Sequence, residues 1–526
     1  MNSPRGATAL IVLILLGATL LFTWPLPTRL TRELPAYDRT PDEDLLSNIW
    51  AVWWTKASLV EGRDSLFYTR SLFFPDGTPL TMSAISVAST VPVLPATILL
   101  PGLDGIFLGW NLNLLATFFL SGVSTFLLAR KVSGSVWAGL AAGLIFAFCP
   151  YRFDHLRHVN LSCTQWIPLV FWTLLRFLET PTLGRSLPLA ASLALVAASS
   201  STYATYLVVI VPLFLAGWFL PRLWGGVPVL TVARQLVELS LPLSMAVLLA
   251  LPVLLPMATD ALFVEFETPT DEDPVHFAYP LETFFLRKAP CYIGNSVALL
   301  STYALAKVPG SGPWALVALA GAALAPGPTL KTASGVWPVS LPYDWIRRLF
   351  PPLKNNRFCE RFLVFWWLGA SILAAQALLV LGRSRPILCG LMAASVFLDL
   401  RPETLATDRP KVPGVYERLS AAPSSWPVYE WPADYLTNRR FMYFQMVHQR
   451  PICQGHLSRR SVASYQTERY DMLSDLPAMI LVVHRDYPAD RFQEHRLSLL
   501  FDRYKADFFA REASCEVWLL RRKAKP

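Results

Sequence analysis

The stretch PDEDLLSNIWAVWW (residues 41–54) sets the interpretation of the whole chain, because an acidic start leads directly into an apolar pattern. The apolar side chains recur three and four residues apart, the spacing of one helix face, at Leu45, Leu46, Ile49, Val52 and Trp53. We expect this helix to lie along a membrane surface, with its tryptophans forming a belt at the lipid headgroups. Asp44 then stands at the helix N-terminus. There it is either a helix cap or a general base or metal ligand, and one residue can be both.

The composition of the chain around this stretch indicates a membrane protein. The 526 residues have a mean hydropathy of +0.40, and 53% are hydrophobic while only 16% are charged. This balance is too apolar for a water-soluble globule of this size. Residues 401–526 hold 20 Lys and Arg and 15 Asp and Glu, which leaves 26 and 22 for the first 400 residues. We therefore predict an α-helical polytopic membrane domain over residues 1–400, with a long first outer loop over residues 25–106, and a small extracytoplasmic α/β domain over residues 401–526.

Apolar stretches in the first 400 residues predict about eleven transmembrane helices, since a crossing of ~30 Å needs roughly 20 mainly apolar residues. They cover residues 7–24, 110–129, 136–148, 166–178, 187–201, 203–220, 236–257, 295–306, 314–325, 362–381 and 387–398. Several are short or contain Pro or Gly, so tilted or broken helices are expected among them.

The orientation follows from the loops that carry Lys and Arg, since these residues resist translocation. With the N-terminus inside, the basic loops are all cytoplasmic: Arg130 and Lys131, Arg176 and Arg185, Arg222 and Arg234, Lys307, and Arg383 with Arg385. The opposite loops contain the acidic runs, and the C-terminal domain lies outside. This orientation requires residues 87–103 to stay in the outer leaflet rather than cross, which Pro92, Pro95 and Pro101 favour.

A second cluster of polar side chains follows the third predicted span. It contains Arg152, His155 and His158, and Gln165 comes shortly after. Arginine and imidazole groups at a membrane surface can bind a phosphate or, together with carboxylates, a divalent metal. The alternative is a solvated loop whose side chains meet lipid headgroups.

Two later segments add cationic candidates. Arg357 and Arg361 lie before the span at residues 362–381, where they can hold a lipid phosphate, contact ordinary headgroups or pair with Glu360. In the tail, buried strands are predicted at residues 426–432, 479–484 and 515–520, with a helix at residues 489–501. His448 and Arg459 either contact donor or acceptor over the membrane or form structural pairs within this domain.

The sequence also excludes two classes of protein. No segment resembles a nucleic-acid-binding arm, because the net charge of +9 is spread over both parts of the chain. The seven cysteines lack CxxC or CxxH spacing and the seven histidines lack an HExxH arrangement, so the common zinc sites are absent from the sequence.

These motifs together resemble the GT-C class of polytopic glycosyltransferases, which use sugars carried on polyprenyl phosphate. Bacterial membrane proteins of this class have a similar first outer loop, matched here by Asp44, Leu45-Leu46, Asn48 and Trp50. The Pro-Tyr-Arg, His-x-x-His and Gln-Trp-x-Pro-Leu series of residues 150–169, and the Pro-Pro and Glu-Arg-Phe runs of residues 351–362, also look like these relatives.

The resemblance implies transfer of a hexosyl or pentosyl group from a lipid-phosphate-linked donor, by direct displacement, in a bacterial-type inner or plasma membrane. It implies that Asp44 is the catalytic base, with Glu43 and Asp42 as substitutes. Dependence on a divalent cation, Mg²⁺ or Mn²⁺, stays open, as does the acceptor, which is a glycan, a lipid or a protein. We expect Asp44 and the cluster from Arg152 to His158 to line one site, because groups more than ~15 Å apart cannot share a small substrate.

Two other functions fit the same sequence. A non-enzymatic transporter or flippase of lipid-linked glycans would use a similar basic and aromatic cavity without needing Asp44. A scaffold in envelope assembly would bind no lipid phosphate. Replacement of Asp44 separates the first of these from an enzyme.

Overall fold

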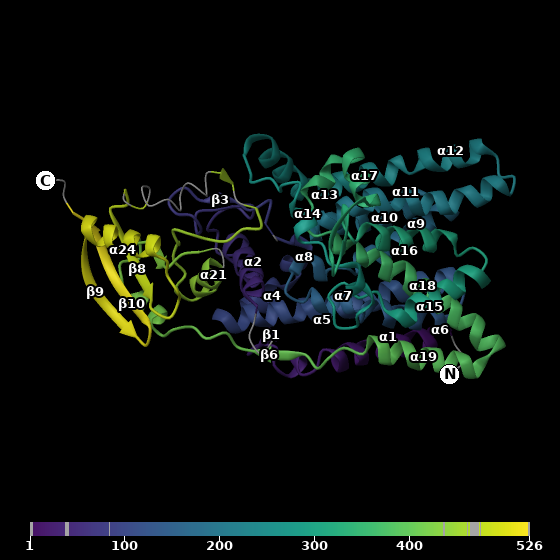
Figure 1. Ribbon diagram of the computed structural model, residues 1–526, viewed down its shortest axis with the longest axis horizontal. Coiled ribbons are helices and arrows are strands. Elements are labelled where there is room, and N and C mark those ends of the chain that lie inside the picture. Colours follow the sequence, from purple (N-terminus) through teal and green to yellow (C-terminus); the bar gives the residue numbers. More distant parts are fainter. Residues whose placement is uncertain are drawn as a thin grey trace.

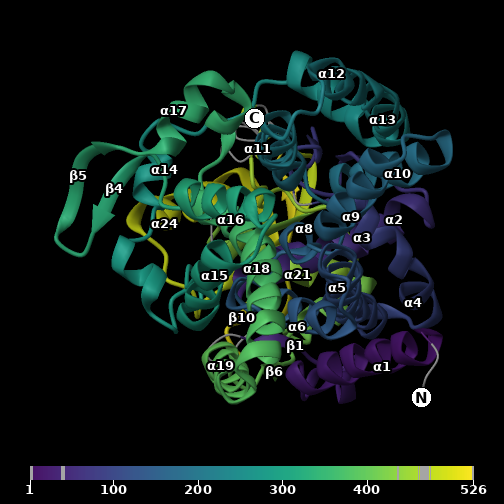
Figure 2. The same cartoon turned by 90° about the vertical axis from the view of Figure 1, so that its right-hand side faces the viewer.

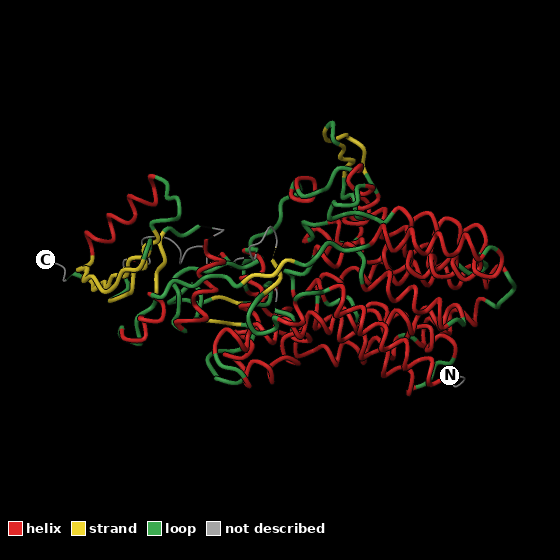
Figure 3. Tube along the Cα trace, turned by 90° about the horizontal axis from the view of Figure 1, so that it is seen from below, coloured by secondary structure: helices red, strands yellow, loops and turns green. Residues whose placement is uncertain are grey.

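The computed structural model is elongated, with a helical bundle at one end and a small sheet domain at the other (Figure 1). It describes residues 4–36, 42–83, 85–434, 437–459, 461–462, 473 and 475–523. Figure 3 shows the same division, with helices filling the bundle end and the largest group of strands at the opposite end. The helical bundle and the four-stranded sheet therefore lie at separate ends, and the domain boundary at residue 400 stays a prediction.

Each of the eleven predicted spans falls on a helix of the bundle. These helices are α1 (Pro4–Phe22), α5 (Gly102–Ser133), α6 (Val136–Ala147), α9 (Trp166–Glu179), α10 (Leu183–Ser199), α11 (Ser201–Trp224), α13 (Ser240–Phe263), α15 (Asn295–Lys307), α16 (Gly312–Leu324), α18 (Leu363–Ser384) and α19 (Pro386–Leu400). Within the described residues, six helical stretches are long and apolar enough to cross a membrane. The chain is thus a polytopic helical membrane protein, and the count of eleven crossings stays a prediction.

Helix α18 forms the core of the bundle, as Figure 2 shows along the long axis. The stretch Cys359–Ser384, which contains α18, has an apolar 18-residue segment that is 83% buried inside the protein. The corresponding segment of Val229–Phe263, which contains α13, is only 17% buried. Glycines allow α16 and α18 to pack backbone against backbone. A Cβ at Gly369 would collide with the carbonyl of Trp314, and one at Gly321 would collide with the backbone of Trp366. Helices in membranes usually pack through small residues at their contacts. The lipid around them is itself apolar, so the hydrophobic effect contributes little to helix association.

The basic loops meet at the end of the bundle that lies away from the sheet domain. Arg130, at the end of α5, donates a hydrogen bond to Thr8 of α1 at 2.9 Å. Lys131 pairs with Glu179 at the end of α9, with 2.7 Å between Nζ and Oε1. The N-terminus lies at this same end (Figure 1). This clustering is the arrangement that the positive-inside pattern requires.

Residues 87–99 form short pieces instead of one long helix. They are α3 (Val87–Thr90), η2 (Val91–Val93) and α4 (Leu94–Leu99), with Pro92 and Pro95 near the start of the second and third pieces. The longest piece has six residues, whereas a crossing takes roughly 20.

The longest helix of the first outer loop is α2 (Glu43–Leu59), and its surroundings correct the sequence interpretation. Trp50, Trp53 and Trp54 are at most 3% exposed, so they do not form a belt in the lipid headgroups. They are covered because α2 packs on α21 (Thr437–His448) of the C-terminal part and on α5. The indole Nε1 of Trp50 donates to Gln445 Oε1 of α21 at 2.8 Å.

The C-terminal part contains a four-stranded sheet in the order β7-β8-β10-β9. β7 (Val428–Trp431), β8 (Ala478–His484) and β10 (Cys515–Arg522) coincide with the three predicted strands, and α24 (Arg491–Arg503) with the predicted helix. The edge strand β9 (Tyr504–Glu512) was not predicted from the sequence. β7 runs parallel to β8, while β10 is antiparallel to both of its neighbours. The domain is thus a small α/β unit, as expected.

A short two-stranded sheet connects the first outer loop with the chain that follows the last bundle helix. In it β1 (Leu34–Ala36) pairs antiparallel with β6 (Ala406–Asp408). A second short hairpin, β4 (Thr329–Thr332) with β5 (Gly335–Ser340), projects from the side of the bundle (Figure 2). The first connection holds the C-terminal domain close to the start of α2.

Candidate functional site

Asp42 fixes the start of α2 and joins it to the short segment, residues 155–158, that follows helix α7 (Pro150–Asp154). Its Oδ1 accepts a hydrogen bond from the backbone N–H of Asp44 at 2.7 Å, which makes it the N-cap residue. Its Oδ2 accepts from Arg157 Nη1 at 2.8 Å. Both oxygens of Asp42 are therefore engaged. The helix cap, one of the roles left open for Asp44, is therefore provided by Asp42, two residues earlier.

The side chain of Asp44 has one oxygen held by an arginine and the other more open. Its Oδ1 lies 2.7 Å from Nη1 of Arg439, which comes from α21. Its Oδ2 lies 3.9 Å from Nε2 of His158, beyond hydrogen-bonding distance. The side chain is 33% exposed. Asp44 and His158 thus lie close together, as the sequence predicts.

Glu43 forms the third contact between α2 and an arginine. Its Oε1 accepts a hydrogen bond from Arg440, and the same guanidinium donates to the hydroxyl of Tyr487 at 3.1 Å. Burial raises the pKa of Glu43 above its usual value, and the nearby charge of Arg440 offsets part of this rise. Its Oε2 is buried, without a hydrogen bond to the residues that are described.

The two histidines between α7 (Pro150–Asp154) and α8 (Val159–Ser162) are neutral at physiological pH. Burial, reinforced by the charge of Arg361, lowers the pKa of His155 to about 3. Burial and the neighbouring His155 lower the pKa of His158 well below its usual value. His155 Nδ1 lies 2.8 Å from the carbonyl of Tyr151, which places a proton on Nδ1. His158 therefore offers a neutral imidazole beside Asp44.

Arg152 and Gln165 lie inside the protein. Arg152 is 1% exposed, and its guanidinium donates to the carbonyl and hydroxyl of Thr117 at 3.1 Å and to the carbonyl of Ser162 at 3.2 Å. It also stacks over Phe118 at 4.4 Å. Gln165 is 5% exposed. The structure therefore surrounds Arg152 with groups of α5 and α8, not with the carboxylates of α2.

Arg357, Arg361 and Arg459 form a second cationic region beside the histidines. Arg357 Nε lies 3.4 Å from Oδ2 of Asp273, and Arg361 stacks over Phe358 at 4.6 Å. Burial lowers the pKa of Arg459, and the nearby charge of Arg357 lowers it further. Arg459 donates a hydrogen bond to the carbonyl of Asn355, two residues before Arg357. A bound anion would relieve this repulsion.

His448 lies in a different place from the other candidates. Its ring stacks on Tyr416 with 5.6 Å between centroids, and its Nδ1 accepts from the backbone N–H of Arg450 at 3.2 Å. Burial and the charge of Arg450 lower its pKa to about 3. These contacts all lie within the C-terminal domain.

The donor set at the start of α2 does not fit a divalent cation. Asp42, Glu43 and Asp44 are each already paired with a guanidinium group. Among the residues that the structure describes, no group of three or more His, Cys, Asp and Glu side chains is placed to hold a metal ion. The described carboxylates therefore do not provide a set of ligands for Mg²⁺ or Mn²⁺.

Sequence reasoning missed the two arginines of α21. Arg439 and Arg440 lie almost 400 residues after their partners on α2, and a tandem arginine carries no distinctive signal by itself. Arg157 was visible within the histidine cluster, but nothing in the sequence indicated its pairing with Asp42. Only the packing of α21 against α2 creates these contacts.

Comparison with known proteins identifies the fold. No family model matches the sequence, and no curated protein matches it. Among solved structures, apo ArnT from Cupriavidus metallidurans aligns with 12% identity and a TM-score of 0.53, over 98% of both chains. AglB, the Archaeoglobus fulgidus oligosaccharyltransferase solved with an inhibitory peptide and a dolichol-phosphate, aligns with 12% identity and a TM-score of 0.51, over 98% of this chain and 74% of that one.

A further oligosaccharyltransferase structure from Archaeoglobus fulgidus, in the apo form, aligns with 12% identity and a TM-score of 0.50. The alignment covers 86% of this chain but only 64% of that enzyme's length. Both ArnT and AglB have the GT-C fold. The chain therefore has the GT-C fold of polytopic membrane glycosyltransferases.

Proposed function

We propose that the protein is a membrane glycosyltransferase that moves a sugar from a polyprenyl-phosphate donor to an extracytoplasmic acceptor. The observation that carries this proposal is the arrangement of Asp44. Its Oδ1 is held at 2.7 Å by Arg439, while its Oδ2 lies near the neutral His158 and is not tightly bonded. A carboxylate fixed through one oxygen can take a proton with the other.

The proposed reaction is a direct displacement at the anomeric carbon. The acceptor hydroxyl gives its proton to Asp44 as its oxygen attacks, and the bond from the anomeric carbon to the phosphate oxygen breaks. The electron pair leaves with the lipid phosphate. Arg357, Arg361 and Arg459 are the proposed phosphate ligands, because guanidinium groups bind phosphate oxygens in pairs and stabilise the departing charge. Asp42 and Glu43 support the site by holding Arg157 and Arg440.

The structural neighbours support the donor class. The AglB structure contains a dolichol-phosphate, which is a lipid phosphate of the kind proposed here. We further propose eleven membrane crossings in a bacterial-type inner or plasma membrane, with the N-terminus in the cytoplasm and the C-terminal domain outside. His448 is proposed as a structural residue of that domain, and the acceptor is a glycan, a lipid or a protein.

Replacement of Asp44 tests the proposal directly. We expect Asp44→Asn to lower sugar transfer from a polyprenyl-phosphate donor by about 10²- to 10⁴-fold, the usual contribution of a general base. The measurement is transfer of radiolabelled sugar in membranes with equal amounts of each variant. Asp104→Asn is the matched control, because Asp104 also pairs with an arginine of the C-terminal segment, Arg409, at 2.8 Å. The control should keep nearly full activity.

The same assay separates the rival functions. If the Asp44→Asn variant transferred sugar at the wild-type rate, Asp44 would not be the catalytic base. A wild-type protein that transfers no sugar but equilibrates the lipid-linked sugar across vesicle membranes would instead be a transporter. A wild-type protein that binds no polyprenyl phosphate would fit the envelope scaffold.

A further inference from the structure

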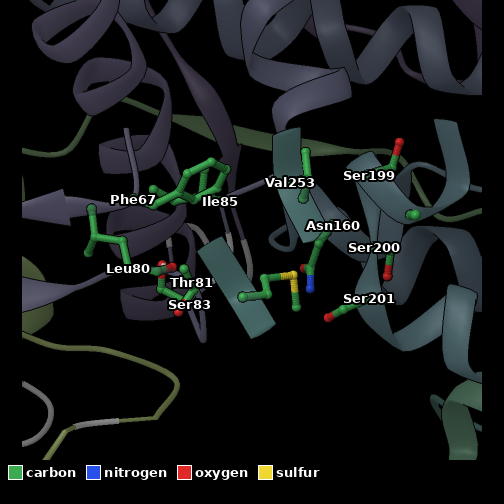
Figure 4. Close-up of a pocket in the computed structure, with 12 residues that line it drawn as sticks. Phe67, Leu80, Thr81, Ser83, Ile85, Asn160, Ser199, Ser200, Ser201 and Val253 are labelled. Atoms are coloured by element: carbon green, nitrogen blue, oxygen red, sulfur yellow. The ribbon is translucent and has the colours of Figure 1, made fainter. Parts of the chain in front are cut away.

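The cavity shown in Figure 4 is too small to hold a substrate. It lies between the first outer loop, α8, the start of α11 and α13, with Leu80, Asn160 and Val253 among its lining residues. Its volume is about 30 Å³, which is room for about two water molecules. A larger partner needs a place on the outer surface of the molecule, and that surface carries a pronounced apolar protrusion.

Five apolar side chains stand out from the side of the bundle on two neighbouring elements. Val336, Trp337 and Val339 belong to β5. Trp345 and Leu349 belong to α17 (Pro342–Leu349), which follows β5 in the chain. The five are between 48% and 84% exposed, and we call them the protruding face. Figure 2 shows β4 and β5 projecting sideways beyond the helices, with α17 beside them. Large apolar side chains that are exposed together mark a surface that binds a partner.

The protruding face stands at one end of the bundle. The hairpin and α17 lie in the connection from the end of α16 to the start of α18. In the same connection the carbonyl of Asn355 accepts a hydrogen bond from Arg459, so this end faces the C-terminal part. The stretch Cys359–Ser384, which contains α18, is apolar and long enough to cross a membrane. The face is therefore attached at the level where a membrane-crossing helix leaves the bilayer.

Hydrogen bonds fix both elements of the protruding face to their surroundings. Lys331 of β4 donates from Nζ to the carbonyl of His276 at 3.1 Å. On α17 the hydroxyl of the buried Tyr343 donates to the carbonyl of Leu353 at 2.9 Å. Because the hairpin and the helix are held in place, their exposed side chains form a surface that a partner can bind with little loss of conformational entropy.

The outward side of α17 presents an aromatic, a cationic and an aliphatic group together. Trp345 and Leu349 are exposed, and the Arg348 side chain between them is 71% exposed. The acidic residue of the helix, Asp344, is only 5% exposed, and its Oδ2 accepts a hydrogen bond from Arg348 at 2.6 Å. Tryptophan and arginine beside aliphatic side chains are typical of elements that lie in the headgroup region of a bilayer. This side of α17 therefore has the chemistry of an interfacial membrane element.

The hairpin can enter the headgroup region but not the hydrocarbon core. It is a sheet of two strands, so both of its edges are open, and unpaired backbone groups are not tolerated in hydrocarbon. Two groups suit a shallow position. The indole Nε1 of Trp337 donates to Thr332 Oγ1 at 3.0 Å, and Pro338 has no backbone N–H to leave unpaired. An interfacial element of this kind lies roughly 5–10 Å into the boundary between headgroups and acyl chains.

We propose that the protruding face inserts into the leaflet on the side of the sheet domain, so that its partner is the phospholipid layer itself. Two observations favour lipid over a protein partner. The face continues the surface of the bundle at the bilayer boundary, and Arg348 provides a cation among its apolar groups, at the depth of the lipid phosphates. The interaction goes beyond the proposed sugar transfer and does not depend on it. The interfacial tryptophans expected on α2 are then Trp337 and Trp345.

Fluorescence quenching of the full-length protein in lipid nanodiscs tests this insertion. The nanodiscs contain phosphatidylethanolamine and phosphatidylglycerol, and the variants Val336→Cys and Leu349→Cys are each labelled with nitrobenzoxadiazole (NBD). One quencher is a phospholipid with a nitroxide high on its acyl chain, and the other is iodide in the buffer. Phe508→Cys is the matched control, because Phe508 is also an apolar residue on a strand and is 56% exposed, against 54% for Val336, but it lies in the sheet domain. The wild-type protein gives the background labelling of its native cysteines.

Because an interfacial residue lies about 5–10 Å into the boundary, we expect the nitroxide lipid to lower the NBD emission of Val336→Cys and Leu349→Cys by about twofold or more. Iodide should quench these two variants much less than Phe508→Cys, which the nitroxide lipid should leave unchanged. Quenching of both by iodide alone would place the face in water and overturn the proposal. Protection from both quenchers would place a second copy or another protein over the face, and would overturn it as well. Neither result depends on whether the protein transfers sugar.

Discussion

The acidic residues at the start of α2 show how strongly a side chain's role depends on its partners. Three consecutive carboxylates meet three arginines from two other segments of the chain. Asp42 uses both oxygens, and Glu43 is partly buried, whereas Asp44 keeps one oxygen near a neutral imidazole. Their order in the sequence alone would not distinguish these environments. Asp44 is the carboxylate of the three whose geometry best fits proton transfer.

The contact of Arg439 with Asp44 predicts the effect of a second substitution. Arg439→Gln removes the group that fixes Asp44 Oδ1, so the carboxylate loses its orientation. We expect a fall in kcat of at least about tenfold, since small displacements of a catalytic group are costly. Arg409→Gln breaks the comparable pair with Asp104 and serves as the control. Equal rates for the two variants would contradict a positioning role for Arg439.

A buried pair in the C-terminal domain predicts a pH dependence of stability. His484 Nε2 lies 2.9 Å from Glu430 Oε2, and its Nδ1 lies 3.3 Å from Cys515 Sγ. Burial by itself lowers the pKa of His484, but the hydrogen bonds to Cys515 and Glu430 and the charge of Glu430 outweigh it and raise the pKa to about 9. The usual value is about 6.5.

The pKa of His484 is therefore higher in the folded protein than in the unfolded chain. The pair of His484 with Glu430 contributes its full stabilisation below about pH 6.5. This contribution is lost as the pH rises through about 9. We expect the Tm of the wild type to fall between pH 7 and 9.5 by at least roughly 1 °C more than that of His484→Gln, the effect of about 1 kcal/mol in a chain of this size. Differential scanning fluorimetry of both full-length proteins measures it. Parallel pH profiles would contradict the pair's role.

At the level of elements, the contact between α2 and α21 explains both a success and a failure of sequence reasoning. The period of apolar residues correctly predicts α2 as a helix. It does not reveal what covers that helix, because α21 lies almost 400 residues further along the chain. A helix side that is rich in tryptophan can lie equally well at a lipid interface or in a protein core. The edge strand β9 was missed because its apolar–polar alternation, clear over Tyr504–Phe508, breaks at Phe509, where the pairing with β10 shifts register.

Gln445 is the residue through which the docking of α21 can be tested. It is 0% exposed, accepts from Trp50 at 2.8 Å, and donates to the carbonyls of Ser71 at 2.5 Å and Arg450 at 3.0 Å. Gln445→Leu leaves these buried groups unpaired, at a cost of about 1–3 kcal/mol for each group. We expect faster proteolysis within residues 401–414 and lower transferase activity.

Gln376→Leu provides a matched control for that experiment. Gln376 is also a buried glutamine, 7% exposed, but it lies within α18 and its Oε1 has no hydrogen-bond partner among the described residues. The control should leave the cleavage rate of residues 401–414 unchanged. Identical rates for wild type and Gln445→Leu would show that this glutamine does not hold α21.

At the scale of the whole molecule, the basic loops and the sheet domain lie at opposite ends (Figure 1). The sequence predicts this separation because the positive residues occupy alternate loops. The pairing of β1 with β6 could not be predicted, since three-residue strands have no periodicity to detect. It brings the first outer loop and the tail together on one side.

Cysteine labelling tests the orientation of the molecule. Ser498, on α24, and Ser384, at the end of α18, are both exposed serines at opposite ends. We expect a membrane-impermeant maleimide to modify Ser498→Cys in intact cells and to modify Ser384→Cys only after lysis. The reverse pattern would place the C-terminal domain in the cytoplasm. The wild-type protein gives the background labelling of its native cysteines.

The pairing of Glu43 with Arg440 joins residues that are 397 positions apart in the chain. The ribosome therefore makes the acid long before it makes the matching cation. During synthesis Asp42 meets Arg157 early, but Glu43 and Asp44 lack their counter-charges, and the proposed reaction centre stays incomplete, until Arg439 and Arg440 have been made. For the proposed transferase, a nascent or prematurely terminated chain that retains every predicted crossing but ends before Arg439 would lack the site's arginines and would not consume the lipid-linked donor.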